Sequence, residues 1–311
     1  MCTAIKFLNY FGRNLDLEYN FNEEVVITPR NYCFNFNSSL SNDKNYALIG
    51  IATKSKNYPL YYDAINEYGL GGVGLSFNKQ NLYSNNLTVK NAIAPYEFLP
   101  FVLRTAKTIK EVKNLLKNHI VVNKSFSKEF AVTNMHFMFA DKNSSIVIET
   151  KDGKINIYNN KLNILTNMPE FYNQIKNLNN YKHLSNKDPN KSEYKGSGAV
   201  GLPGDYTSVS RFVKTDFILK NSAIINKNNN ELTQFFKVLD SVFVPFGAVK
   251  INNKFFHTIY TTGYNLKDLT LCFKTYNNNR ISQVSMLKEN LDLNKLICYP
   301  INNKQDILYL N

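Results

Sequence analysis

Short alternating and β-branched segments recur along the chain and predict a strand-rich fold. Residues 3–7, "TAIKF", alternate between polar and apolar positions, and residues 24–28, "EVVIT", are rich in β-branched side chains. Both patterns are typical of β-strands, and the polar linkers "DKN", "KDGK" and "NNN" are typical of hairpin turns. Strands are predicted over residues 3–7, 24–28, 46–53, 72–77, 130–140, 144–150, 154–160, 257–266, 269–276 and 280–287.

Helical patterns are fewer and occur in pairs between runs of strands. Thr108 and Glu111 form a capping box in front of an apolar stripe that includes Ile109, Val112 and Leu116. Because strands and helices do not alternate regularly, we expect an α+β sandwich of antiparallel sheets covered by helices rather than a doubly wound parallel sheet. Further helices are predicted over residues 169–184, with Pro169 at the first helical position, 206–220 and 231–243.

One domain, residues 1–311, is the expected organisation, because the sequence contains neither an internal repeat nor a linker rich in proline, glycine and serine. Residues 185–204 are polar and irregular. Loops of that length usually carry function or contact a partner.

The composition excludes several classes of protein. Hydrophobic residues make up 43% of the chain and charged residues 20%, which is a globular composition. No apolar run approaches the ~18–20 residues that span a bilayer, and the start of the chain lacks the features of a cleavable signal, so we expect a cytoplasmic protein with no membrane partner. Its cysteines and histidines show neither CxxC pairs nor ligand spacing, so no disulfide and no metal are expected. These residues are Cys2, Cys33, Cys272, Cys298, His119, His136, His183 and His257.

The net charge of +13 does not by itself indicate a nucleic-acid partner. The lysines are dispersed among asparagines, as in "KNLNNYKHLSNKDPNKSEYK", rather than gathered with aromatic residues on one helix. We therefore expect a basic surface and no nucleic acid. Such a surface also raises the local concentration of anionic small molecules.

Cys2 is the candidate nucleophile. Removal of Met1 would make it the first residue, with its thiol and its own α-amine on the same residue. An α-amine has an ordinary pKa of roughly 7.7–8.0 and can accept the thiol proton near neutral pH. Arg13 would stabilise the thiolate, and Asp16 would accept hydrogen bonds from the amine. Taken alone, a second-position cysteine is more often incidental, and both charged residues also fit a solvated strand end.

Strand geometry constrains this arrangement. In an extended segment Cys2, Ala4 and Lys6 share one face, and a returning antiparallel strand brings Arg13 back beside them. Arg13 and Asp16 differ in parity, so both can face Cys2 only if a turn or bulge interrupts the second strand near residues 14–15.

Five segments in order resemble the choloylglycine hydrolase family, which includes bile salt hydrolases and penicillin V acylases. They are "MCTAI", "FGRNLDLEYNF", "NEYGLGGVGLSF", "ILTNMPEF" and "GLPGDYTSVSRF". The resemblance implies the N-terminal nucleophile hydrolase fold, a four-layer αββα sandwich of two antiparallel sheets covered by helices. It also implies a homo-oligomer, with a tetramer favoured, assembled through residues 185–204.

The resemblance further implies roles for individual residues. Cys2 matches the nucleophile, Arg13 and Asp16 the residues that hold its thiol and amine, and Arg211 a second active-site arginine. Asn167 matches a donor to the tetrahedral oxyanion, although a helix cap is the simpler interpretation of an isolated asparagine before Met-Pro. Arg211, on a predicted helix, could equally be a surface residue.

Two features depart from the family pattern: the length of the first hairpin and the residue at position 76. The first hairpin is several residues shorter, which keeps Cys2 paired with Arg13 only if the loss is confined to its tip. Ser76 replaces the asparagine usual in bile salt hydrolases, although the main-chain N–H at this position could still serve the oxyanion.

The sequence therefore predicts a hydrolase of non-peptide linear amide bonds that needs no cofactor. The favoured substrate is a bile acid conjugated to glycine or taurine, and its steroid requires an apolar wall. Leu15, Tyr61, Tyr62 and residues 137–139 are the candidates for that wall. A penicillin V acylase or an N-acyl homoserine lactone acylase is the alternative enzyme, and a catalytically inactive binding protein on the same scaffold is the alternative from another class.

Overall fold

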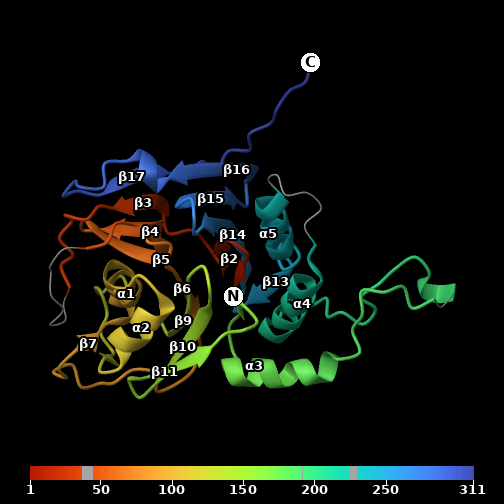
Figure 1. The fold of residues 1–311 in the computed structure, drawn as a ribbon, viewed down its shortest axis with the longest axis horizontal. Coiled ribbons are helices and arrows are strands. Elements are labelled where there is room, and N and C mark those ends of the chain that lie inside the picture. Colours follow the sequence, from red (N-terminus) through yellow and green to blue (C-terminus); the bar gives the residue numbers. More distant parts are fainter. Residues whose placement is uncertain (37–44, 191, 224–229) are drawn as a thin grey trace.

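Two β-sheets face each other at the centre of the molecule, and helices cover their outer faces (Figure 1). The computed structural model describes residues 1–36, 45–190, 192–223 and 230–311. Helices α1 and α2 lie against the larger sheet, and α4 and α5 lie against the smaller one. The order of layers is helix, sheet, sheet, helix, as predicted. The helices are α1 (Phe98–Thr105), α2 (Ile109–Leu116), α3 (Phe171–Asn177), α4 (Ser208–Asn221) and α5 (Asn230–Asp240).

The smaller sheet contains both strands of the first hairpin, and the larger sheet contains most of the remaining strands. In order across the smaller sheet, its strands are β12 (Ile164–Leu165), β1 (Cys2–Phe7), β2 (Tyr10–Leu17), β14 (Lys254–Asn265), β15 (Thr270–Thr275) and β16 (Asn278–Ser285), with β13 (Val249–Ile251) paired to β14. Across the larger sheet they are β17 (Ile297–Pro300), β3 (Glu24–Thr28), β4 (Leu48–Ser55), β5 (Tyr58–Asn66), β6 (Gly71–Ser76), β9 (Met135–Ala140), β10 (Ser145–Lys151), β11 (Lys154–Asn159), β8 (Ile120–Val121) and β7 (Ala92–Ile93). Short 3₁₀ turns complete the structure at η1 (Pro95–Glu97), η2 (Leu178–Tyr181), η3 (Ser192–Tyr194) and η4 (Met286–Lys288).

Side-chain alternation along the strands divides the core into two parts. On β4, Ile49 and Ile51 pack between the two sheets, whereas Leu48 and Ala52 pack beneath α1. This is the period-2 pattern of a strand buried on both faces. The space between the sheets therefore holds one apolar core, and β1 places Cys2 at its edge.

The predicted strands are all present, with three corrections to the detail. Residues 130–134 are not part of β9, and residues 130–133 line a cavity instead. The sheets are not wholly antiparallel, because β7 and β8 pair in parallel at one edge. The sequence pattern also did not identify β5, whose residues "YPLYYDAIN" contain a proline and no clean alternation.

Helix starts follow the predicted chemistry in part. Thr108 Oγ1 accepts a hydrogen bond from the Glu111 N–H at 3.2 Å, but the Glu111 carboxylate accepts from the Lys107 N–H at 2.8 Å rather than from Thr108. Pro169 is not the first residue of a helix; it precedes the N-cap, Glu170, and follows a cis peptide bond.

Residues 185–190 and 192–204 leave the body of the molecule as an arm between α3 and α4 (Figure 1). In the part of the chain that the structure describes, no helix combines the length and apolar character needed to cross a membrane.

Candidate active site

Cys2 and Arg13 face each other across the first hairpin. Cys2 pairs with Leu15 and Ala4 with Arg13, so these side chains share one face of the sheet. Arg13 Nη2 donates to Cys2 Sγ at 2.5 Å, and both residues are buried. The turn consists of residues 8–9, because Phe7 already pairs with Tyr10. The cysteine–arginine register is thus intact in a hairpin with a two-residue turn.

The Arg13 guanidinium lies where the ladder between β5 and β6 stops. That ladder extends only as far as the pairing of Asp63 with Val73. Beyond it, Arg13 Nη1 donates to Gly74 O at 2.6 Å and to Tyr62 O at 3.4 Å. Burial lowers the pKa of Arg13, but the negative groups around it, Cys2 first among them, outweigh this effect and raise it overall. Arg13 therefore stays a cation beside the thiol.

Asp16 lies on the opposite face of β2 from the thiol, because no turn or bulge interrupts this strand near residues 14–15. Strand β2 is continuous, and the irregularity lies on the neighbouring strand, where Thr258 pairs with Asp16 but Tyr260 pairs with Leu15. Thr258 Oγ1 donates to Asp16 Oδ1 at 2.7 Å. Asp16 Oδ2 is buried and has no hydrogen-bond partner among the described residues.

Met1 extends the first hairpin by one residue. Its ammonium group donates to Asp16 O at 2.8 Å, and Met1 O accepts from the Asp16 N–H at 3.1 Å. The Cys2 nitrogen is therefore a peptide N–H in this chain, and it donates to Asn167 Oδ1 at 2.7 Å. A free amine forms at this position only when Met1 is removed.

Arg211 reaches from α4 to the start of β1 and is fully buried rather than at the surface. Its Nη1 donates to Cys2 O at 2.5 Å and to Thr3 Oγ1 at 2.6 Å, and its Nη2 donates to Asn167 Oδ1 at 2.8 Å. Burial lowers the pKa of Arg211, while Asp16 and Cys2 act in the opposite direction. Arg211 thus connects the cysteine to the asparagine.

The Asn167 side chain is hydrogen-bonded to both β1 and β6, through Cys2 and Ser76 respectively. It does not cap α3, whose N-cap is Glu170. Its Nδ2 donates to Ser76 O at 2.7 Å. An amide nitrogen carries two N–H donors, so this bond occupies one of them.

The main-chain N–H of Ser76 points to the same side as these groups. Just beyond the ladder between β6 and β9, the Phe77 N–H donates to Asn134 O at 2.8 Å. In an antiparallel ladder such pairs alternate, so Ser76 and Gly74 direct their main-chain groups away from β9. Their carbonyls indeed accept from Asn167 and Arg13. The Ser76 N–H is therefore directed toward the region that holds Cys2.

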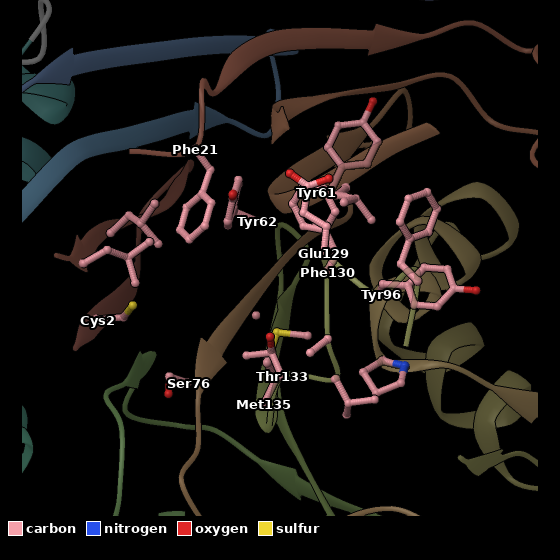
Figure 2. A pocket seen from close by; sticks show the side chains of 18 of the residues that line it. Cys2, Phe21, Tyr61, Tyr62, Ser76, Tyr96, Glu129, Phe130, Thr133 and Met135 are labelled. Carbon is pink, nitrogen blue, oxygen red and sulfur yellow. The ribbon is translucent and has the colours of Figure 1, made fainter. Parts of the chain in front are cut away.

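A cavity of about 420 Å³ opens from Cys2. Figure 2 shows Cys2 and Ser76 near one end and Tyr96 at the other, with Phe21, Tyr61 and Tyr62 along one side. Most of its lining is aromatic or aliphatic, which is typical of a small-molecule site. The lining residues also include Leu15, Leu17, Tyr19, Leu60, Phe126, Phe130, Val132 and Met135.

Of the residues proposed for the apolar wall, Leu15, Tyr61 and Tyr62 line the cavity and residues 137–139 do not. Phe137 stacks on Phe98 beneath α1, with the ring centroids 4.3 Å apart, and does not line the cavity. Phe126 and Phe130 also line the cavity. They were not predicted as wall residues, because they lie in an irregular segment without a periodic pattern.

The chain belongs to the choloylglycine hydrolase family of linear amide C–N hydrolases, whose profile matches residues 2–299. It is 39% identical to a bile salt hydrolase/transferase from Lactiplantibacillus plantarum and 36% identical to one from Clostridium perfringens, with 100% of each chain covered. The solved structure of the C2A variant of conjugated bile acid hydrolase from Clostridium perfringens superposes with a TM-score of 0.91 at 33% identity, again over 100% of both chains.

Penicillin V acylase from Agrobacterium tumefaciens shares the fold, with a TM-score of 0.77 at 20% identity over 96% of this chain and 91% of that one. These similarities confirm the predicted family, the N-terminal nucleophile hydrolase fold and the enzyme class, an amidohydrolase.

Proposed function

We propose that this enzyme hydrolyses the amide bond of bile acids conjugated to glycine or taurine, with Cys2 as the nucleophile. The observation that carries the proposal is the thiol of Cys2, which lies 2.5 Å from a buried guanidinium at one end of an apolar cavity. Relatives named as bile salt hydrolases and conjugated bile acid hydrolases, similar over the full chain, support the choice of substrate.

The proposed reaction begins after removal of Met1. The α-amine of Cys2 takes the thiol proton, and the sulfur attacks the amide carbonyl. Asn167 Nδ2 and the Ser76 N–H donate to the oxyanion, since both are directed toward the thiol region. The protonated amine then gives its proton to the leaving nitrogen, so that glycine or taurine departs and a thioester remains.

Water completes the cycle. The now neutral amine accepts a proton from water as the oxygen attacks the thioester carbonyl, and the thiolate leaves as the free bile acid forms. Arg13 stabilises the thiolate at both ends of the cycle. Asp16 Oδ2, which is buried and unpartnered among the described residues, would accept an N–H from the new amine.

Arg211 positions this group of residues. Its bonds to Cys2 O and Asn167 Oδ1 hold the nucleophile and the oxyanion donor in one arrangement. The steroid would occupy the apolar cavity, and the basic character of the chain would favour an anionic conjugate.

The test is turnover by purified enzyme with taurocholate, glycocholate, penicillin V and an N-acyl homoserine lactone, with the released amine or acid quantified. We expect glycine or taurine release, and none from a Cys2→Ala variant. Release only from penicillin V or the lactone would assign an alternative acylase instead. Absence of turnover with every substrate, from folded protein without Met1, would support the inactive binding protein.

We also propose a single domain, a homotetramer and a cytoplasmic location. The exposed arm that includes residues 185–190 and 192–204 supports the assembly, because it extends away from the body where another subunit could cover it. Light scattering coupled to size-exclusion chromatography of the full chain and of a variant shortened in this arm would test the tetramer.

A further inference from the structure

Arg13 is a fully buried cation whose nearest negative partner changes during the proposed reaction. Among the described residues, its hydrogen-bond acceptors are the carbonyls of Asn14, Tyr62 and Gly74 and the sulfur of Cys2. Carbonyls carry no net charge, and a buried charge is costly unless it is balanced. The sulfur is negative as a thiolate but neutral in the thioester, so a second and lasting anion is required.

Asp63 lies on the inner face of β5 directly behind this cation. It is fully buried and pairs with Ile51 and Val73, two residues of the core between the sheets. It follows Tyr62, whose carbonyl accepts from Arg13. The Asp63 carboxyl therefore enters the space between the two sheets from the strand that Arg13 contacts.

Two tyrosines of β14 hold the Asp63 carboxyl from the opposite sheet. Tyr260 donates its hydroxyl to Oδ2 at 2.6 Å, and Tyr264 donates to Oδ1 at 2.5 Å. Between them on the same face of β14 is Thr262, which pairs directly with Arg13. The two hydroxyls consequently hold the Asp63 carboxyl near the level of β14 at which Thr262 pairs with Arg13.

The hydrogen-bond pattern fits an ionised carboxylate. Both oxygens accept O–H bonds, and a carboxylate is an acceptor only. Burial raises the pKa of Asp63 above its usual value overall, and the Arg13 charge and the hydroxyls of Tyr260 and Tyr264 favour the ionised form and limit that rise. Burial also raises the pKa of each tyrosine well above its usual value, which keeps both as neutral donors.

We infer that Asp63, fixed by Tyr260 and Tyr264, is a positioning residue that provides the permanent counter-charge of Arg13 while the Cys2 sulfur passes between thiolate and thioester. This role rests on the proposed function. Without the Asp63 charge, any reaction that neutralises the sulfur leaves Arg13 buried and unbalanced. Acylation of Cys2 by substrate and its alkylation by a small electrophile should therefore both become slower.

The test compares Asp63→Asn with wild type and with Asp141→Asn. Asp141 is also a buried aspartate, but it accepts from the N–H groups of Ile109, Asn143 and Ser144 at a helix start and turn. It therefore controls for loss of a buried carboxylate. Iodoacetamide is added to protein lacking Met1, and alkylation of the Cys2 peptide is followed by mass spectrometry, which separates it from the exposed Cys33.

We expect Asp63→Asn to slow Cys2 alkylation by about tenfold or more, the effect of one pKa unit of charge interaction, and to lower kcat/KM in parallel. Asp141→Asn should lower the thermal midpoint without changing either rate. Equal rates in Asp63→Asn and wild type, or equal slowing in both variants, would overturn the inference.

If Asp63→Asn does not fold, the Tyr260→Phe and Tyr264→Phe variants keep the carboxylate but remove its donors, and each should slow alkylation by a smaller factor. Unchanged alkylation in both would overturn the inference. Alkylation needs no substrate, so failure of the bile salt assignment would appear separately, as wild-type protein that alkylates normally but releases no glycine or taurine.

Discussion

Removal of the Asn167 side chain is expected to lower kcat, because it leaves only the main-chain N–H of Ser76 to stabilise the oxyanion. Asn167→Ala deletes the proposed side-chain donor to the oxyanion and breaks the bonds to Cys2 N, Arg211 Nη2 and Ser76 O. Loss of one oxyanion donor costs about 2.7–4 kcal/mol, or roughly 10²–10³ in kcat. Loss of a charge-assisted bond from Arg211 adds about 1.5–3 kcal/mol of destabilisation.

Ser76→Ala is the matched control, because it leaves the main-chain N–H of residue 76 in place. Its kcat should stay within about threefold of wild type, since the side chain is exposed and the proposed donor belongs to the backbone. Steady-state release of taurine from taurocholate, measured below the thermal midpoint of each variant, provides the comparison. A kcat in Asn167→Ala above one tenth of wild type, or a larger loss in Ser76→Ala than in Asn167→Ala, would refute the assignment of the two donors.

Three further changes probe other parts of the molecule. Arg211→Met should lower kcat by about 100-fold or more, because Cys2 and Asn167 lose their shared anchor; full activity would exclude a positioning role. Phe130→Ala should raise KM for conjugated bile salts by about 5–30-fold with little change in kcat, since it removes about 1–2 kcal/mol of apolar contact in the cavity; an equal fall in kcat would contradict this. Hydrogen bonds from Ser210 and Thr207 lower the pKa of Asp205, so its stabilising contribution is present above the unfolded-state pKa and is lost as pH falls through the folded one. Asp205→Asn should consequently lower the thermal midpoint at pH 7 and do so progressively less as the pH falls below about 4, and a difference that stays constant over this range would rule out the linkage.

The first hairpin shows how far local reasoning extends. Strand parity alone placed Cys2 and Arg13 on one face, because side chains alternate with a period of two. The same parity separates Asp16 from them, because the irregularity in this part of the sheet lies on β14 and not in β2. The residues of β14 are more than 240 positions away in the chain, and nothing in the first hairpin encodes where its neighbour bulges.

The cavity and the Asp63 network were less accessible from sequence. Phe137 and Phe130 are both aromatic residues in one apolar stretch, yet one packs under α1 and the other lines the cavity. Their difference depends on where β9 begins, which the composition of the stretch does not specify. Asp63 is an ordinary aspartate in sequence, and its importance follows from two tyrosines of a distant strand.

The most direct test of the account is the mass of the covalent intermediate. Enzyme mixed with excess glycocholate should be quenched in acid within the first turnovers and analysed intact and after digestion. We predict a chain without Met1 that carries one choloyl group as a thioester on Cys2. Fully active enzyme that retains Met1, or a choloyl group attached to any other residue, would contradict the central claim.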